Sequence, residues 1–226
     1  THRLLKAEGL KVPAQRRAGS AKENADFLQR HKRRVVKPLR GEQGQGVAVD
    51  LRSKEEVEAA VAAASKDGDA VLLEEFVEGE DLRIIVIGFK VVAAAIRRPA
   101  EVVGTGHHTI EALIEKQSRR RQAATQGESR IPLDEETRRC VQAAGYELDS
   151  ILPEGKALLV RKAANLHTGG TIHDVTDQLH PQLVEAAVGA ARAIDIPVVG
   201  LDFLVPSPTA PDYVIIEANE RPGLAN

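Results

Sequence analysis

The stretch VVGLDFLVPSPTAPDYVIIEANERPGLAN, residues 198–226, places polar side chains inside two apolar runs. A proline-rich turn joins the runs, and this pattern predicts two short strands. Glu217 and Asn219 are two positions apart in the second strand, so they share one face, and Asp202 lies inside the first strand. If the strands pair, these three oxygen-bearing side chains form the kind of ligand set that Mg²⁺ prefers. A salt bridge from Glu217 to Arg221 is the alternative.

The composition of the 226-residue chain is that of a soluble globular protein. Its formal net charge of −2 gives no general attraction to nucleic acid or to an anionic membrane. Aromatic residues make up 3%, so stacking platforms for single-stranded nucleic acid are scarce. The single cysteine, Cys140, excludes an internal disulfide framework and is typical of a cytoplasmic protein. No apolar run approaches the roughly 18 residues of a membrane span, so we expect neither membrane nor nucleic-acid partners.

Capping signals and turn residues predict a mixture of helices and strands. Ser20 with Glu23, and Ser53 with Glu56, form two capping boxes that open helices. The other expected elements are a short helix before Pro13, a strand–glycine turn–strand at 34–51, a helix end at Gly68, a strand at 70–83, a hairpin around Gly88, helices from near Thr109 and from Asp134 to Gly145, a strand running into a polar loop at 157–181, a helix opened by Pro181, and the two terminal strands. This order predicts the α+β class.

A glycine-rich segment, KPLRGEQGQG at residues 37–46, follows an apolar strand. Glycines at positions 41, 44 and 46 let backbone N–H groups approach phosphate oxygens, and Lys37 adds a positive charge. The segment differs from a P-loop, in which the lysine follows the glycines, and from GxGxxG at a helix start. It predicts a flap over a triphosphate. An ordinary glycine-rich hairpin turn is the alternative.

The segment LLEEFVEGEDLR, residues 72–83, combines an apolar strand with Glu74, Glu75, Asp81 and Arg83. Backbone groups of a chain leaving a strand can hydrogen-bond an adenine edge, and Asp81 can accept hydrogen bonds from both ribose hydroxyls. A strand that ends in a solvated acidic turn is the alternative.

A third segment, LVRKAANLHTGG at residues 159–170, places Arg161 and Asn165 before two glycines. A guanidinium can hold phosphoryl oxygens, and a Thr-Gly-Gly loop can bind an anion through its amides. A surface loop with a helix cap is the alternative.

Several chemically reactive residues carry no functional prediction. The arginine run at 119–121 is interpreted as a solvated helix end. Cys140 follows the helical period of a core face and has no base beside it. Five histidines lie in loops without the spacing of a zinc site, namely His107, His108, His167, His173 and His180.

Taken in order, these segments resemble the ATP-grasp superfamily over essentially the whole chain. The segments GTGHHTIEALIE, AGYELDSILPEG and VRKAANLHTGGTIHDVTDQLHP resemble the ATP-grasp parts of cyanophycin synthetase and bifunctional glutathione synthetase. EANERPGLAN together with VVKPLRGEQGQG resembles N-acetylglutaminylglutamine synthetase. The resemblance implies an ATP-grasp fold, in which two α+β lobes hold ATP between antiparallel sheets. The first lobe is expected at about 14–77 and the second at about 78–226.

The resemblance also assigns roles to residues. Arg161 and Asn165 would stabilise the transferring phosphoryl group and the acyl phosphate. The implied ligands of two Mg²⁺ ions, for which Mn²⁺ could substitute, are Asp202, Glu217 and Asn219. The implied ATP contacts are Lys37 with phosphate and adenine, Gly41, Gly44 and Gly46 over the triphosphate, the backbone of Glu74, Glu75, Phe76 and Val77 with adenine, Asp81 with the ribose, and Arg83.

The implied activity is that of an ATP-dependent carboxylate–amine ligase that forms an amide or peptide bond through an acyl phosphate. The expected partners are ATP and small amino-acid or dipeptide substrates, of the glutamine type or N-acylated, and a homo-oligomer is compatible with this activity. Two alternatives remain, a non-catalytic nucleotide-binding regulatory module and a ligase of the cyanophycin or glutathione synthetase type.

The ends of the sequence depart from the family pattern. Family members normally carry a further domain before this region, and we expect that domain to be absent from this sequence. The chain begins at Thr1 and contains no methionine, so we expect it to be part of a longer protein. It stops shortly after the PG of EANERPG, so we expect substrate contacts beyond Asn226 to be missing.

Overall fold

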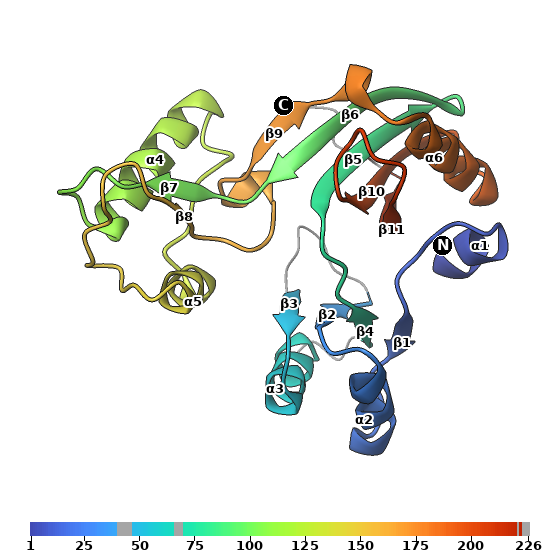
Figure 1. Cartoon of the computed structure of the whole chain (residues 1–226), viewed down its shortest axis with the longest axis horizontal. Coiled ribbons are helices and arrows are strands. Elements are labelled where there is room, and N and C mark those ends of the chain that lie inside the picture. The colour runs from blue at the N-terminus through green and yellow to red at the C-terminus, as the bar shows by residue number, and fades with distance from the viewer. Residues whose placement is uncertain (40–46, 66–69, 221, 223–226) are drawn as a thin grey trace. The chain divides into compact units, whose positions relative to one another are not determined.

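The computed structural model describes residues 1–39, 47–65, 70–220 and 222 (Figure 1). Two compact units make up the chain, Thr1–Ala95 with Asp174–Asn226, and Ile96–His173. Antiparallel sheets and helices occur together, which confirms the predicted α+β class. The predicted lobe boundaries stay a prediction. Among the described residues, none of the helices has the length and apolar character needed to cross a membrane.

The first sheet belongs to the first unit and has the strand order β1-β4-β2-β3, with every pair antiparallel. Its strands and helices are β1 (Gln15–Arg17), α2 (Ala21–Arg30), β2 (Arg34–Pro38), β3 (Ala48–Leu51), α3 (Lys54–Ala64) and β4 (Val71–Glu75). Both predicted capping boxes are present at the starts of α2 and α3. Val36 and Leu73 are fully buried in the core of this sheet, together with Val57 of α3. The predicted helix end at Gly68 lies outside the described residues.

The second sheet has the order β11-β10-β5-β6-β9. Its strands are β5 (Glu80–Ile87), β6 (Lys90–Arg98), β9 (Thr171–Asp174), β10 (Val198–Val205) and β11 (Val214–Asn219). The predicted hairpin joins β5 to β6 through Gly88 and Phe89, whose φ angles of 57° and 58° suit a two-residue turn. Helices α1 (His2–Ala7) and α6 (Pro181–Ala193) belong to the first unit, as does the short 3-10 helix η2 (Thr176–Gln178). Pro181 opens α6 as predicted.

The second unit contains a two-stranded sheet of β7 (Glu101–Val103) and β8 (Ala157–Leu159). Its helices are α4 (Ile110–Ala124), α5 (Glu135–Ala143) and the 3-10 helix η1 (Leu166–Thr168). Thr109 and Asp134 cap α4 and α5, so both predicted helix starts are confirmed. Ile110, Ile114 and Leu152 are fully buried in the core of this unit.

Two expectations for the strands were incomplete. The segment 70–83 was expected to hold one strand, but it contributes β4 to the first sheet and the start of β5 to the second. The chain leaves the β4 ladder before Gly79, where a Cβ would lie 2.9 Å from the Val205 carbonyl oxygen. Gly79 thus permits the close approach to Val205 next to the Glu80–Val205 pair, where β5 begins to pair with β10. The expected polar loop at 157–181 contains the strand β9.

A positive-φ residue of β3, Asp50 (φ 57°), makes a strong ion pair beside α3. Its Oδ1 lies 2.6 Å from Arg33 Nε, and the hydrogen bond from Arg33 lowers the pKa of Asp50 to about 2. Because its pKa is lowered in the folded state, ionised Asp50 stabilises the fold above the unfolded pKa of about 3.9. This stabilisation is lost as the pH falls toward the folded pKa.

Replacing Asp50 by asparagine is therefore expected to cost about 1–2 kcal/mol of unfolding free energy at pH 7, after discounting for partial exposure. Asparagine tolerates the positive φ, so the backbone is not strained. The difference from the parent should close between about pH 4 and pH 2. Urea unfolding across this range measures it, with Asp26→Asn, an exposed carboxylate of α2, as the control. A pH-independent difference would contradict the ion-pair explanation.

Candidate functional site

A row of charged side chains crosses three strands of the second sheet. The ladder places Asp202 of β10 opposite Arg83 of β5 on one side and opposite Glu217 of β11 on the other. Directly opposed residues point to the same face of an antiparallel sheet, and Asn219 shares that face because it is two positions beyond Glu217. The register shifts between Asp202 and Phe203, a β-bulge of the kind found near functional sites.

The side chains of this row are tied to one another. Asp202 is 3% exposed, and Arg83 donates to both of its oxygens, from Nε to Oδ1 at 2.8 Å and from Nη2 to Oδ2 at 2.9 Å. The Asn219 amide donates to Asp202 Oδ2 at 3.4 Å. Turned over, this amide donates to Glu217 Oε1 at 3.1 Å and accepts from Arg83 Nη2 at 3.3 Å. The cluster therefore has one buried, fully bonded carboxylate and a second carboxylate on an exposed side chain, Glu217.

The donor chemistry of Asp202, Glu217 and Asn219 suits a hard cation. It supplies two carboxylates and one amide oxygen on one sheet face, and Mg²⁺ takes its other ligands from water and phosphate. Among the described residues, no three His, Cys, Asp or Glu side chains are grouped to hold a metal. A Mg²⁺ ion at this cluster would thus need ligands beyond the His, Cys, Asp and Glu side chains of the described residues. The alternative pairing of Glu217 with Arg221 lies outside the described residues.

Lys37 lies in β2 of the first sheet, and its ammonium group forms an ion pair with Glu74. Its Nζ is 2.7 Å from Glu74 Oε2, an oxygen that also accepts a hydrogen bond from the Gln15 side chain. Glu74 is 4% exposed, so the ammonium of Lys37 is needed to compensate a buried carboxylate. The three predicted glycines, Gly41, Gly44 and Gly46, lie outside the described residues.

The predicted adenine segment, Glu74 to Val77, has mostly occupied amides. The N–H of Glu75 donates to the Ala14 carbonyl at 2.9 Å, and the N–H of Phe76 donates to the Arg33 carbonyl at 3.0 Å. The Phe76 ring also stacks on the Arg33 guanidinium, 4.1 Å away. Within the described part of the chain, no backbone carbonyl accepts from the Val77 N–H. The contact of the Val77 amide with an adenine edge stays a prediction.

Asp81, the predicted ribose ligand, lies in β5 opposite Leu204. It precedes Arg83 by two positions, so it lies on the same face of the sheet as the row through Asp202. Five predicted site residues therefore share this face, and they are Asp81, Arg83, Asp202, Glu217 and Asn219.

The guanidinium of Arg161, which follows β8 in the second unit, is held by α5. Nη1 is ion-paired with Asp134, the cap of α5, and lies 3.2 Å from Thr137 Oγ1. The Arg161 side chain is 12% exposed, and its buried Nε makes no hydrogen bond to the described residues. These contacts hold Arg161 inside the unit, and its role on a phosphoryl group stays a prediction.

The loop from Asn165 to Gly170 is closed by its own hydrogen bonds. Asn165 Oδ1 accepts from the His167 N–H at 2.9 Å, and the Asn165 carbonyl accepts from Thr168 and Gly170. The Gly169 N–H donates to the Leu166 carbonyl at 3.0 Å. All four amides from 167 to 170 are thus engaged, so in this conformation they do not bind an anion. Asn165 acts here as the cap of η1.

Comparison with known proteins identifies the fold. Residues 1–106 match the RimK-like ATP-grasp domain family. Over 97% of its length the chain is similar to the crystal structure of a bifunctional glutathione synthetase from Pasteurella multocida, with a TM-score of 0.61, 25% identity and 32% of that chain covered. The chain has the ATP-grasp fold.

Other proteins are similar to this ATP-grasp chain. Cyanophycin synthetase from Trichormus variabilis is 36% identical over 239 residues, which covers 99% of the chain and 26% of the relative. A D-alanine–D-alanine ligase from Bacillus anthracis, solved in complex with ATP, has a TM-score of 0.57 at 15% identity, covering 99% of this chain and 55% of that one. The chain thus spans about a quarter of the length of this cyanophycin synthetase. These comparisons do not show the resemblance to N-acetylglutaminylglutamine synthetase, which stays a prediction.

One arginine of α4 has a specific position in this ATP-grasp chain. Arg121 was interpreted as part of a solvated helix end, but its Nη1 donates to the Gly170 carbonyl at 2.9 Å. Its Nε is buried, and burial lowers the pKa of the guanidinium. The helical period contained the signal, because Arg121 follows the fully buried Ile114 by seven residues and shares its face.

Replacing Arg121 by methionine is expected to lower the unfolding free energy by about 1–2 kcal/mol, because the Gly170 carbonyl loses its donor. Methionine keeps much of the apolar packing of the side chain. Amide hydrogen exchange of the loop at 165–170 should accelerate. The matched control is Arg120→Met, on the exposed neighbour in α4. Equal exchange in the two variants would contradict a role for Arg121 in holding the loop.

Cys140 lies in the core as its helical period predicted, but the prediction that no base lies beside it is wrong, because its thiol donates to Glu136 Oε1 at 3.6 Å. Cys140 is 6% exposed in α5, and burial raises the pKa of its thiol to about 11. A thiol with so high a pKa is a poor nucleophile at neutral pH.

Proposed function

We propose that this chain carries the nucleotide-binding and phosphoryl-transfer site of an ATP-dependent carboxylate–amine ligase. The observation that carries the proposal is the row of Arg83, Asp202 and Glu217 across three paired strands. Polar groups inside apolar strands are costly unless they are paired or used, and here they share one sheet face in an ATP-grasp fold. The names of the relatives, cyanophycin synthetase and glutathione synthetase, support a reaction that joins a carboxylate to an amine.

Nucleotide binding would use strands of both larger sheets, all of them within the first unit. The Val77 amide would hydrogen-bond the adenine, and Asp81 would accept from the ribose hydroxyls. Lys37 would contact phosphate, with Glu74 fixing its ammonium. The glycines of the segment 41–46 would cover the triphosphate.

Asp202, Glu217 and Asn219 would hold Mg²⁺, and we expect two ions. A bound Mg²⁺ would neutralise charge on the phosphates during transfer. Arg83 would keep Asp202 in place through its two hydrogen bonds and would add a positive charge to the same face.

The chemistry would proceed in two displacements. A substrate carboxylate oxygen attacks the γ-phosphorus of ATP, the bond to the β-phosphate oxygen breaks, and ADP leaves. An amine then attacks the acyl carbon, inorganic phosphate leaves, and the nitrogen loses a proton to give the amide. Arg161 and Asn165 would stabilise the transferring phosphoryl group. No side-chain nucleophile is required, because positioning and electrostatics supply the catalysis.

The proposed substrates are small amino acids or dipeptides of the glutamine type, or N-acylated amino acids. A ligase of the cyanophycin or glutathione synthetase type is the nearest variant of this proposal. A non-catalytic nucleotide-binding module is the second candidate, and specific observations favour it. In the described conformation Arg161 is ion-paired with Asp134, and the amides of the loop at 167–170 are internally bonded.

The experiment incubates the full-length protein with ATP and Mg²⁺ and with carboxylate and amine substrates, singly and in pairs. Release of ADP and phosphate that needs both substrates, together with an amide product seen by mass spectrometry, supports the ligase. ATP binding without release for any pair supports the non-catalytic module. Absence of ATP binding would overturn both.

A further inference from the structure

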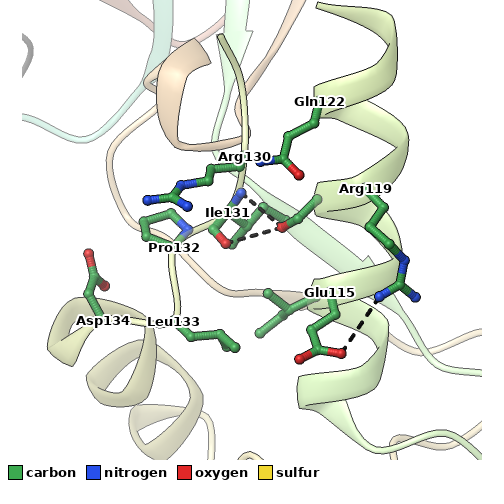
Figure 2. A pocket seen from close by; sticks show the side chains of 10 residues that line it. Glu115, Arg119, Gln122, Arg130, Ile131, Pro132, Leu133 and Asp134 are labelled. Atoms are coloured by element: carbon green, nitrogen blue, oxygen red, sulfur yellow. Dashed lines mark hydrogen bonds and ion pairs between the residues drawn. The ribbon is translucent and has the colours of Figure 1, made fainter. Parts of the chain in front are cut away.

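A groove in the second unit lies between α4 and the segment at 129–134, which we call the wall segment (Figure 2). Its volume is about 570 Å³, a size that suits a small organic ligand. Apolar side chains that line it are Ile114 and Ile131, both buried, and Leu133. Charged side chains also line it, and none of them belongs to the site proposed above.

The wall segment is fixed in place. Ser118 Oγ of α4 donates to the Ile131 carbonyl and accepts from the Ile131 N–H, each at 3.1 Å. Figure 2 shows both bonds between helix and wall. A groove whose walls are joined in this way is formed before any ligand binds, which lowers the entropy cost of binding.

Among the described residues, one cation that lines the groove has no counterion. Glu115 pairs with Arg119 at 3.8 Å on α4, and Asp134 pairs with Arg161, which does not line this groove. Arg130 is different, since among the described residues none forms an ion pair or a hydrogen bond with its guanidinium. Figure 2 shows Arg130 and Asp134 on the side opposite the Glu115–Arg119 pair.

The wall segment contacts Arg161 and also the loop that Asn165 caps. These are the two residues predicted to act on the phosphoryl group. Ser129 Oγ donates to the Leu166 carbonyl, and the Arg130 N–H donates to the His167 carbonyl at 3.1 Å. These contacts hold the loop that Asn165 caps. At its other end the wall segment ends in Asp134, the partner of Arg161. A ligand in the groove would therefore contact the same segment that positions these residues.

We propose that the groove binds the carboxylate-bearing end of an amino-acid or dipeptide substrate, with Arg130 as the residue that determines this specificity. A guanidinium binds a carboxylate through two parallel hydrogen bonds, and Pro132 and Leu133 would receive the aliphatic part of the ligand. The identity of the ligand as a substrate rests on the proposed function, whereas the specificity for a carboxylate rests on the groove alone.

The test titrates the full chain, without ATP, with N-acetyl-L-glutamine, L-glutamine and the dipeptide glutamylglutamine at millimolar concentrations. Methyl NMR signals of Ile114 and Ile131 report on the groove, and isothermal titration calorimetry gives the Kd. Arg130→Gln should raise the Kd about tenfold. Arg120→Gln removes the same charge outside the groove and should change the Kd less than about twofold. In N-acetyl-L-glutaminamide a neutral amide replaces the carboxylate. This compound should bind the parent as weakly as N-acetyl-L-glutamine binds Arg130→Gln.

Two outcomes would overturn the proposal, unchanged methyl signals with all three probes, or equal Kd values for the two variants. Turnover separates it from the proposed function. If ADP release occurs and Arg130→Gln leaves the substrate KM unchanged, the ligase stands and the groove does not. If the probes bind through Arg130 but no ADP is released, the carboxylate groove stands and the ligase does not.

Discussion

Turnover is expected to fall by about 10²–10³-fold when Glu217 is replaced by glutamine, because the change removes one of two carboxylates from the proposed metal site. The fold should remain, since Glu217 is exposed and glutamine preserves its shape. ADP release under saturating ATP measures the loss, and thermal unfolding checks the fold. Raising the Mg²⁺ concentration should restore part of the activity, because the loss is in metal affinity.

The matched control is Asp212→Asn, in the turn between β10 and β11. Asp212 is also a carboxylate, and its Oδ1 forms an ion pair with the exposed Lys11 at 3.0 Å. Asp212 lies outside the row of Arg83, Asp202 and Glu217, so the turnover of the Asp212→Asn variant should match that of the parent. A Glu217→Gln protein that retains full activity would remove Glu217 from the metal site.

The second large effect concerns stability. Replacing Arg83 by methionine is expected to lower the unfolding free energy by about 3 kcal/mol, because the buried Asp202 would lose the guanidinium that donates to both of its oxygens. The Asp202 side chain is 4% exposed, so water cannot take the place of the guanidinium. Urea unfolding at pH 7 measures the loss.

Two further variants test the cause. Adding Asp202→Asn to Arg83→Met should recover part of the lost stability, because the buried charge is removed. Arg17→Met, on an exposed arginine of β1, should have an effect within about 0.5 kcal/mol. If the double variant is no more stable than Arg83→Met, the loss comes from packing and not from the broken ion pair.

The structure changes how the proposed nucleotide contacts are to be tested. Lys37 compensates the buried Glu74, so its removal affects the fold as well as ATP. A loss of activity in a Lys37 variant would therefore be ambiguous. Glu217 is the better position, because its side chain is exposed and its change separates turnover from folding.

Local signals in the sequence determined most helix and strand positions. The capping boxes of α2 and α3, the caps at Thr109 and Asp134, and the hairpin at Gly88 are all found as expected. These signals depend on residues a few positions apart, so they are readable without a fold. The period of two likewise put Glu217 and Asn219 on one face.

The tertiary structure alone decided the partners of these residues. Arg83 and Asp202 are 119 positions apart, and only the pairing of β5 with β10 sets them opposite each other. The burial of Arg121 and the closed amides of the loop at 167–170 depend in the same way on contacts between distant segments. No local pattern encodes such contacts, because they arise when separate elements pack. The sequence determined which side chains share a face, and the packing decided what each of them binds.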